Sequence, residues 1–135
     1  MGSELTTLEP PSWPEELGAH LPAIVEQEVI EAADTFPVET GLGWDKLHPR
    51  VVGRISTSLL TLLIQILTIC ELTGRWPKAV ALVLIALLPK TDGGFRPIGL
   101  IPFLPRLWMR VRRRIASLWE AAKPRPYLYA GRGKG

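Results

Sequence analysis

The chain has 135 residues, of which 47% are hydrophobic and 21% are charged, and its formal net charge is +3. A chain of this length forms one domain with a modest core. Its single cysteine, Cys70, excludes an internal disulfide and a zinc cluster built on cysteines. Residues 1–16 contain four glutamates and no basic residue, which argues against a secretory signal peptide and favours an intracellular setting.

Charge is unevenly distributed along the chain. Residues 1–48 contain ten acidic residues and one basic residue, whereas residues 89–135 contain eleven basic and two acidic residues. This polarity predicts either that the C-terminal half meets nucleic acid or another anionic surface, or that the two halves attract each other.

The sequence of the first half of the chain predicts two helices joined by a loop. The helix expected at residues 22–35 belongs to an acidic N-terminal region, residues 1–35. In the loop at residues 36–49, Asp45 either caps the helix that follows or orients a backbone segment. Residues 51–73 predict one largely buried helix that ends at Gly74, and its frequent polar residues favour a core helix over a membrane span.

A hairpin is predicted next. The apolar run at residues 79–88 predicts a strand buried on both faces, and Asp92-Gly93-Gly94 then predicts a tight turn. If these three residues form the loop, Lys90 faces Arg96. Because like charges that face each other destabilise a hairpin, such a pair is either solvated or offered to an anion such as phosphate.

Residues 103–122 predict an amphipathic helix with an apolar stripe for the core. Five arginines lie mostly off this stripe, namely Arg106, Arg110, Arg112, Arg113 and Arg114. They form a solvated face or contact a phosphate backbone, and a helix lying on a membrane surface is the competing interpretation.

Several sequence blocks, taken in order, resemble the fingers of reverse transcriptases (RNA-directed DNA polymerases) of non-LTR retrotransposons and group II introns. The blocks are Thr40-Gly-Leu-Gly-Trp-Asp45-x-Leu-His-Pro49, Gly74-x-Trp76-Pro77, Ile85-x-Leu-Leu-Pro-Lys90, Gly94-Phe-Arg-Pro-Ile98, the arginine-rich helix, and Tyr127-Leu-Tyr-Ala-Gly-Arg-Gly-Lys-Gly135. The resemblance covers residues 36–135 and implies an α+β fold. This fold would be a helix-rich fingers segment with a β-hairpin, in a right-hand polymerase fold that is incomplete because the palm is absent.

The resemblance also implies site residues. Lys90 and Arg96 would contact the triphosphate of an incoming deoxynucleotide. The arginines that would contact the template or primer backbone are Arg106, Arg110 and Arg113. These roles imply a template–primer, a deoxynucleotide triphosphate and the missing palm portion as partners, and no membrane.

No catalytic residue or metal ligand is expected in this chain. The two-metal mechanism of nucleotidyl transfer needs carboxylates, and no aspartate occurs after Asp92. The resemblance therefore implies a segment that is catalytically incomplete alone, with Mg²⁺ belonging to the complete polymerase. Two alternatives remain open, namely a basic, helix-rich nucleic-acid-binding module without polymerase ancestry and a membrane-associated protein.

Overall fold

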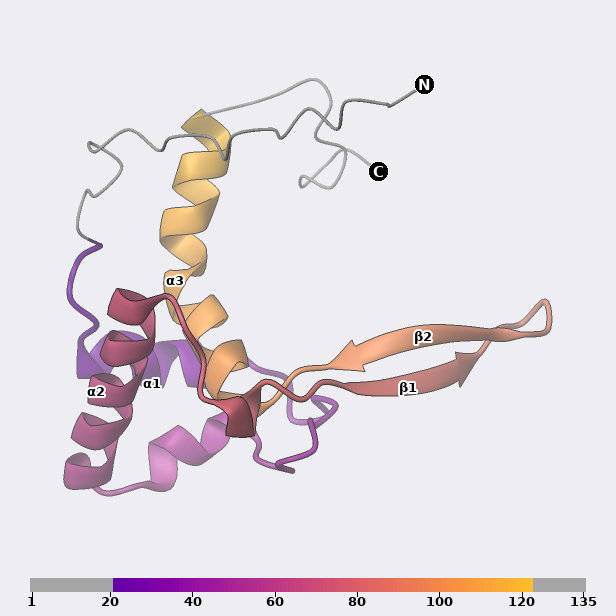
Figure 1. Ribbon diagram of the computed structural model, residues 1–135, viewed down its shortest axis with the longest axis horizontal. Coiled ribbons are helices and arrows are strands. Elements are labelled where there is room, and N and C mark those ends of the chain that lie inside the picture. Colours follow the sequence, from indigo (N-terminus) through magenta and orange to yellow (C-terminus); the bar gives the residue numbers. More distant parts are fainter. Residues whose placement is uncertain (1–20, 123–135) are drawn as a thin grey trace, which may run out of the picture.

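The computed structural model describes residues 21–122. Its elements in chain order are α1 (Glu26–Asp34), the 3-10 helix η2 (Pro49–Arg54), α2 (Thr57–Thr73), the short 3-10 helix η3 (Lys78–Val80), β1 (Leu84–Pro89), β2 (Phe95–Leu100) and α3 (Phe103–Ala122). The helices form one body, from which the antiparallel hairpin β1–β2 projects (Figure 1). The predicted α+β class is confirmed.

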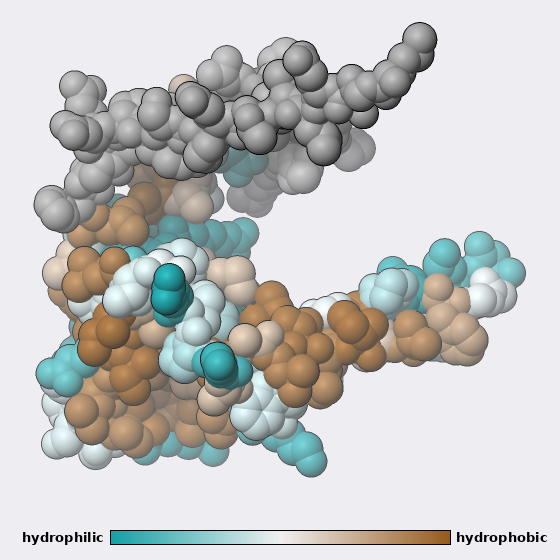
Figure 2. Space-filling model, in the orientation of Figure 1, coloured by the Kyte–Doolittle hydropathy of each residue, from teal (hydrophilic) through white to brown (hydrophobic). Residues whose placement is uncertain are grey.

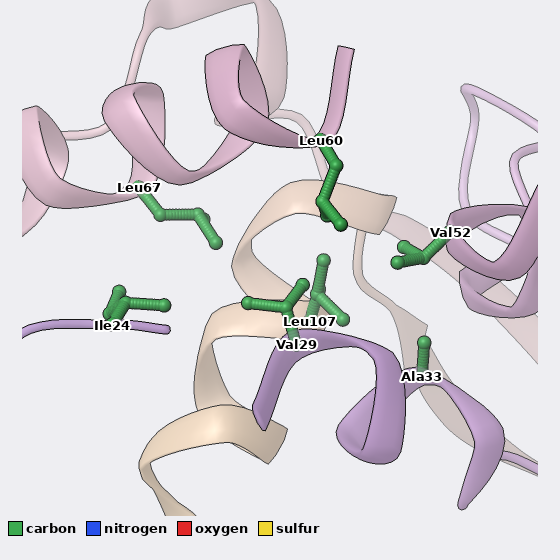
Figure 3. Packing of buried hydrophobic residues seen from close by; sticks show 7 residues of the cluster. All are labelled: Ile24, Val29, Ala33, Val52, Leu60, Leu67 and Leu107. Carbon is green, nitrogen blue, oxygen red and sulfur yellow. The ribbon is translucent and has the colours of Figure 1, made fainter. Parts of the chain in front are cut away.

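The core lies where α1, α2, η2 and α3 meet. Val29, Leu67 and Leu107 are fully buried, and Val52 is 2% exposed. Leu60 and Leu67 of α2 point toward Val29 of α1 and Leu107 of α3 (Figure 3). Burial of each such side chain contributes about 1.5–3 kcal/mol, so this cluster holds the helices together.

The single helix expected at residues 51–73 is two elements, and this prediction was wrong. His48 caps η2, because its Nδ1 accepts a hydrogen bond from the Arg50 N–H. Ile55 is then extended, and Ser56 starts α2 by accepting the Leu59 N–H with its Oγ. The serine cap therefore divides an apolar run that periodicity alone reads as continuous. The predicted end of α2 at Gly74 is confirmed by its left-handed φ of 64°.

The outward face of α2 is exposed, although the sequence predicted that much of this helix is buried. Leu62, Ile69 and Leu72 are 54%, 58% and 78% exposed. Their side chains lie opposite Leu60 and Leu67, and no other described element covers them. The sequence is apolar around most of the helix, but only one side of it meets the body.

The strand predicted at residues 79–88 is shorter and is not buried on both faces. It begins at Leu84, after η3, and among residues 21–122 it pairs only with β2. Ile85 and Leu87 are each 62% exposed, and Phe95 on the same face of β2 is 64% exposed. A doubly buried strand needs a layer on each face, and in residues 21–122 the helices pack on one another instead. Figure 2 shows the hydrophobic length of the hairpin, with hydrophilic residues gathered at its tip.

The loop before η2 is fixed to the start of α3. Asp45 accepts the Phe103 N–H with Oδ2 at 2.7 Å and the Leu47 N–H with Oδ1 at 3.3 Å. Asp45 therefore caps a helix far along the chain, not the one that follows it. Gly43 permits this approach, because a Cβ at this position would lie 2.9 Å from the Ile101 carbonyl oxygen.

The helix α3 has the predicted bounds, residues 103–122. No helix among residues 21–122 combines the length and the apolar character that crossing a membrane requires.

Candidate phosphate-binding surfaces

The turn of the hairpin differs by two residues from the predicted register. Leu88 pairs with Arg96, and beyond this pair the Lys90 N–H donates to the Gly94 carbonyl at 3.0 Å. The three-residue loop is therefore residues 91–93, not Asp92–Gly94. Gly94 lies opposite Lys90 at the base of the loop, whereas the sequence predicted it as the last residue of the loop. Gly93 and Gly94 both have a positive φ, of 85° and 84°, which glycine adopts readily.

Lys90 and Arg96 still lie on the same face of the hairpin, because a shift of two residues preserves the face. They are diagonal neighbours and not directly opposite, which corrects the prediction. Diagonal positions are about 7–8 Å apart, a distance that long side chains can bridge. Both residues line one hollow at the tip, together with Pro89, Thr91 and Asp92. We call this the tip hollow.

The cations of the tip hollow are available to a ligand. Both Lys90 and Arg96 are exposed, and within residues 21–122 neither side chain makes an ion pair or a hydrogen bond. Asp92 lines the same hollow, so two positive charges and one negative charge surround it. This arrangement can hold a phosphate group, because Arg can bind two phosphate oxygens at once and Lys adds a point charge.

The arginines predicted to contact a nucleic-acid backbone also share one hollow. Residues that line it are Phe36, Arg106, Met109, Arg110 and Arg113. We call it the arginine hollow. Arg106 donates to the Gly41 carbonyl, and the Arg110 guanidinium lies 4.3 Å from the centroid of the Phe36 ring. Arg113 is exposed and makes no ion pair within residues 21–122. Each guanidinium has five N–H donors, so Arg106 and Arg110 keep donors for a ligand while the body holds them in place.

Arg112 differs from its neighbours, because it is buried and has a structural role. Its Nε and Nη2 donate to the two carboxylate oxygens of Glu71 at 2.7 and 2.6 Å, and the Trp108 Nε1–H donates to the same carboxylate at 2.8 Å. The Arg112 bonds lower the pKa of Glu71, although partial burial opposes this shift. The expectation that Arg112 lies on a solvated or ligand-binding face was wrong.

A further cationic hollow was not singled out from the sequence. It is lined by Val38, Lys46, Leu47, His48, Arg50, Val51 and Arg54, and we call it the loop hollow. Its cations are spread over nine positions of a loop and a 3-10 helix, so neither a helical nor a strand period places them on one face. The sequence feature that could have indicated this hollow was the spacing Lys46-x-His48-x-Arg50, because no acidic residue occurs between Lys46 and Glu71.

No cluster of three or more His, Cys, Asp or Glu side chains in the described part of the chain is placed to hold a metal ion. Comparisons with protein-family models, with curated proteins and with solved structures find no match to this chain.

Proposed function

We propose that this chain is the fingers portion of a retroelement reverse transcriptase, which binds the triphosphate of an incoming deoxynucleotide at the tip hollow. The observation that carries the proposal is the placement of Lys90 and Arg96 on one face of a projecting hairpin, both lining one hollow. A triphosphate offers several oxygens to these two unpartnered cations, and charge-assisted hydrogen bonds of this kind are the strong ones.

In this proposal the arginine hollow contacts the backbone of the template or primer. Arg106 and Arg110 are held by Gly41 and by the Phe36 ring, so little side-chain freedom is lost when they bind. Contacts to phosphates position a nucleic acid without reading its sequence, which suits a polymerase.

Catalysis requires a palm in this proposal. The carboxylates that hold two Mg²⁺ ions would belong to the palm, because this sequence has no aspartate after Asp92. The exposed apolar side chains of Ile85, Leu87 and Phe95 support a packing surface for a larger partner of this kind. On this basis the chain binds nucleotide and nucleic acid but does not polymerise alone.

The test is equilibrium binding of a fluorescent deoxynucleotide triphosphate to the full chain at two salt concentrations. The variant Lys90→Gln/Arg96→Gln should bind at least tenfold more weakly, because each lost charge-assisted bond contributes about 1.5–3 kcal/mol and about 1.4 kcal/mol corresponds to tenfold. The matched control, Arg75→Gln/Lys78→Gln, removes the same charge from two exposed side chains, one just after α2 and one at the start of η3, and should bind normally.

A second variant tests the same hollow in the opposite direction. Asp92→Asn removes the negative charge at the tip and should strengthen binding of the triphosphate in the absence of Mg²⁺. Equal losses in the tip variant and its control, or an unchanged affinity in Asp92→Asn, would contradict binding at the tip hollow.

A nucleic-acid-binding module without a polymerase role is the second candidate, and the arginine hollow favours it. It predicts that Arg113→Gln weakens oligonucleotide binding, while the tip variant leaves triphosphate affinity unchanged. The fingers proposal predicts that both variants lose affinity, each for its own ligand.

A further inference from the structure

The loop hollow is lined by both cationic and apolar residues. Lys46, Arg50 and Arg54 carry three positive charges around it, and no acidic residue lines it. Lys46 and Arg54 are exposed, and within residues 21–122 their side chains make no ion pair or hydrogen bond. Its apolar lining includes Val38 and Leu47, which are 72% and 47% exposed. This hollow therefore offers charge for an anion and apolar surface for a group attached to it.

Hydrogen bonds of His48 and Asp45 hold the backbone around the loop hollow and do not involve the side chains of Lys46 and Arg54. His48 accepts the Arg50 N–H with Nδ1, and its Nε2 lies 3.0 Å from the Pro37 carbonyl oxygen. Because the backbone N–H can only donate, Nδ1 is unprotonated and Nε2 carries the hydrogen. Lys46 has a positive φ of 54°, which is uncommon for a residue other than glycine, and Asp45 beside it is bonded to Phe103.

The loop hollow and the arginine hollow each have a residue that contacts the C-terminal end of α1 or the residues just after it. Arg50 Nη2 donates to the carbonyl of Asp34, the last residue of α1, at 3.1 Å. Phe36, two residues later, lies beneath the Arg110 guanidinium. The end of a helix carries partial negative charge, and α1 has no basic residue in its last turn. Arg50 of the loop hollow and Arg110 of the arginine hollow thus both contact the short segment at residues 34–36.

We propose that the loop hollow binds the phosphodiester backbone of a nucleic-acid strand that continues onto the arginine hollow. The choice of nucleic acid as the ligand rests on the proposed function. One small anion would need only one of the hollows, whereas a strand presents phosphates at regular intervals to both. The apolar lining residues Val38, Leu47 and Val51 then pack against a sugar or base of that strand.

The experiment measures binding of a labelled single-stranded DNA oligonucleotide to the full chain over a range of salt concentrations. In Lys46→Gln/Arg54→Gln, the slope of log K against log salt concentration should decrease in magnitude by about 1.4, since each phosphate contact to a single strand contributes about 0.7. Affinity at low salt should fall at least tenfold. Arg75→Gln/Lys78→Gln loses the same charge elsewhere and should keep the slope of the unmodified protein.

The outcomes separate this inference from the proposed function. If the Lys46/Arg54 variant keeps its slope while the tip variant still loses triphosphate affinity, the loop hollow is not a nucleic-acid site and the proposed function stands. If the control loses the same slope, the effect is general positive charge and the inference is overturned. If neither ligand binds to a chain whose circular dichroism shows folded helices, both proposals fail.

Two other sources of phosphate, a free anion and a lipid headgroup, are tested separately. Inorganic triphosphate should displace the oligonucleotide only at high concentration, because it cannot span both hollows. If inorganic triphosphate displaced the labelled oligonucleotide at the same concentration as unlabelled oligonucleotide does, the loop hollow would be a site for free anions and the inference would be overturned. Vesicles of anionic phospholipid should bind the variant and the unmodified chain equally, and a loss confined to the variant, with unchanged oligonucleotide binding, would also overturn it.

Discussion

Replacing Arg112 with methionine should lower the free energy of unfolding by about 3 kcal/mol. The substitution removes two charge-assisted hydrogen bonds to Glu71, at 2.7 and 2.6 Å. Within residues 21–122 it leaves that carboxylate with the Trp108 N–H as its one remaining donor. Breaking a buried ion pair costs about 3–5 kcal/mol when the partner charge stays behind. The Glu71 side chain is 16% exposed, so water can partly solvate it, and the lower end of that range applies.

Urea unfolding followed by tryptophan fluorescence measures this loss. Trp108 lies within the network and packs edge-on against Trp76, with ring centroids 5.8 Å apart, so its emission reports on this part of the core. The double variant Arg112→Met/Glu71→Leu should recover most of the stability, because it leaves no unpaired charge. A loss below about 1 kcal/mol in the single variant would give this pair the value of a surface ion pair and refute the reasoning. A double variant as unstable as the single one would refute it too.

Two further predictions concern acid stability and the loop. The pKa of Glu71 is lower in the folded chain than its usual 4.5, so its contribution is present above that pH and is lost as the pH falls through the folded-state value. Glu71→Gln should therefore flatten the acid side of the stability curve in urea unfolding, and a parallel curve would contradict this. Gly43→Ala should cost about 1–3 kcal/mol, because the new Cβ would lie 2.9 Å from backbone atoms of Ile101 and Pro102. Gly53→Ala, with no atom within 4 Å of its Cβ position, should change stability by less than about 0.5 kcal/mol, and equal effects would show that the loop does not pack there.

Local sequence features predicted where helices and strands begin and end better than they predicted which residues pack around them. The bounds of α3 and the end of α2 at Gly74 followed from helical period and from the left-handed preference of glycine. The burial of β1 did not follow, because an apolar run of residues reports hydrophobic character and not which layers are present to cover it. The break before α2 was missed for a related reason, since Ser56 is one polar residue among several in the run and only its backbone geometry makes it a cap.

The candidate sites divide in the same way. The common face of Lys90 and Arg96 could be predicted, because side chains alternate along a strand and an error of two residues preserves the face. The role of Arg112 could not be predicted, since its partner Glu71 lies forty-one residues earlier, on another helix. The loop hollow depends on how residues 46–54 fold against the end of α1, and the spacing Lys46-x-His48-x-Arg50 does not reveal that contact.

The hydrogen bond from Phe103 to Asp45 joins residues 58 positions apart and encloses α2 and the whole hairpin. Leu107, one turn further, completes the core cluster, so the part of the chain before residue 103 lacks one of its core side chains until α3 has been synthesised. The hairpin thus lies within the loop of chain that the contact between Asp45 and Phe103 closes. Closing a longer loop costs only about 0.6 kcal/mol for each doubling of its length. Insertions at the hairpin tip should therefore be tolerated by the helical body, whereas a chain that ends before residue 103 should not fold.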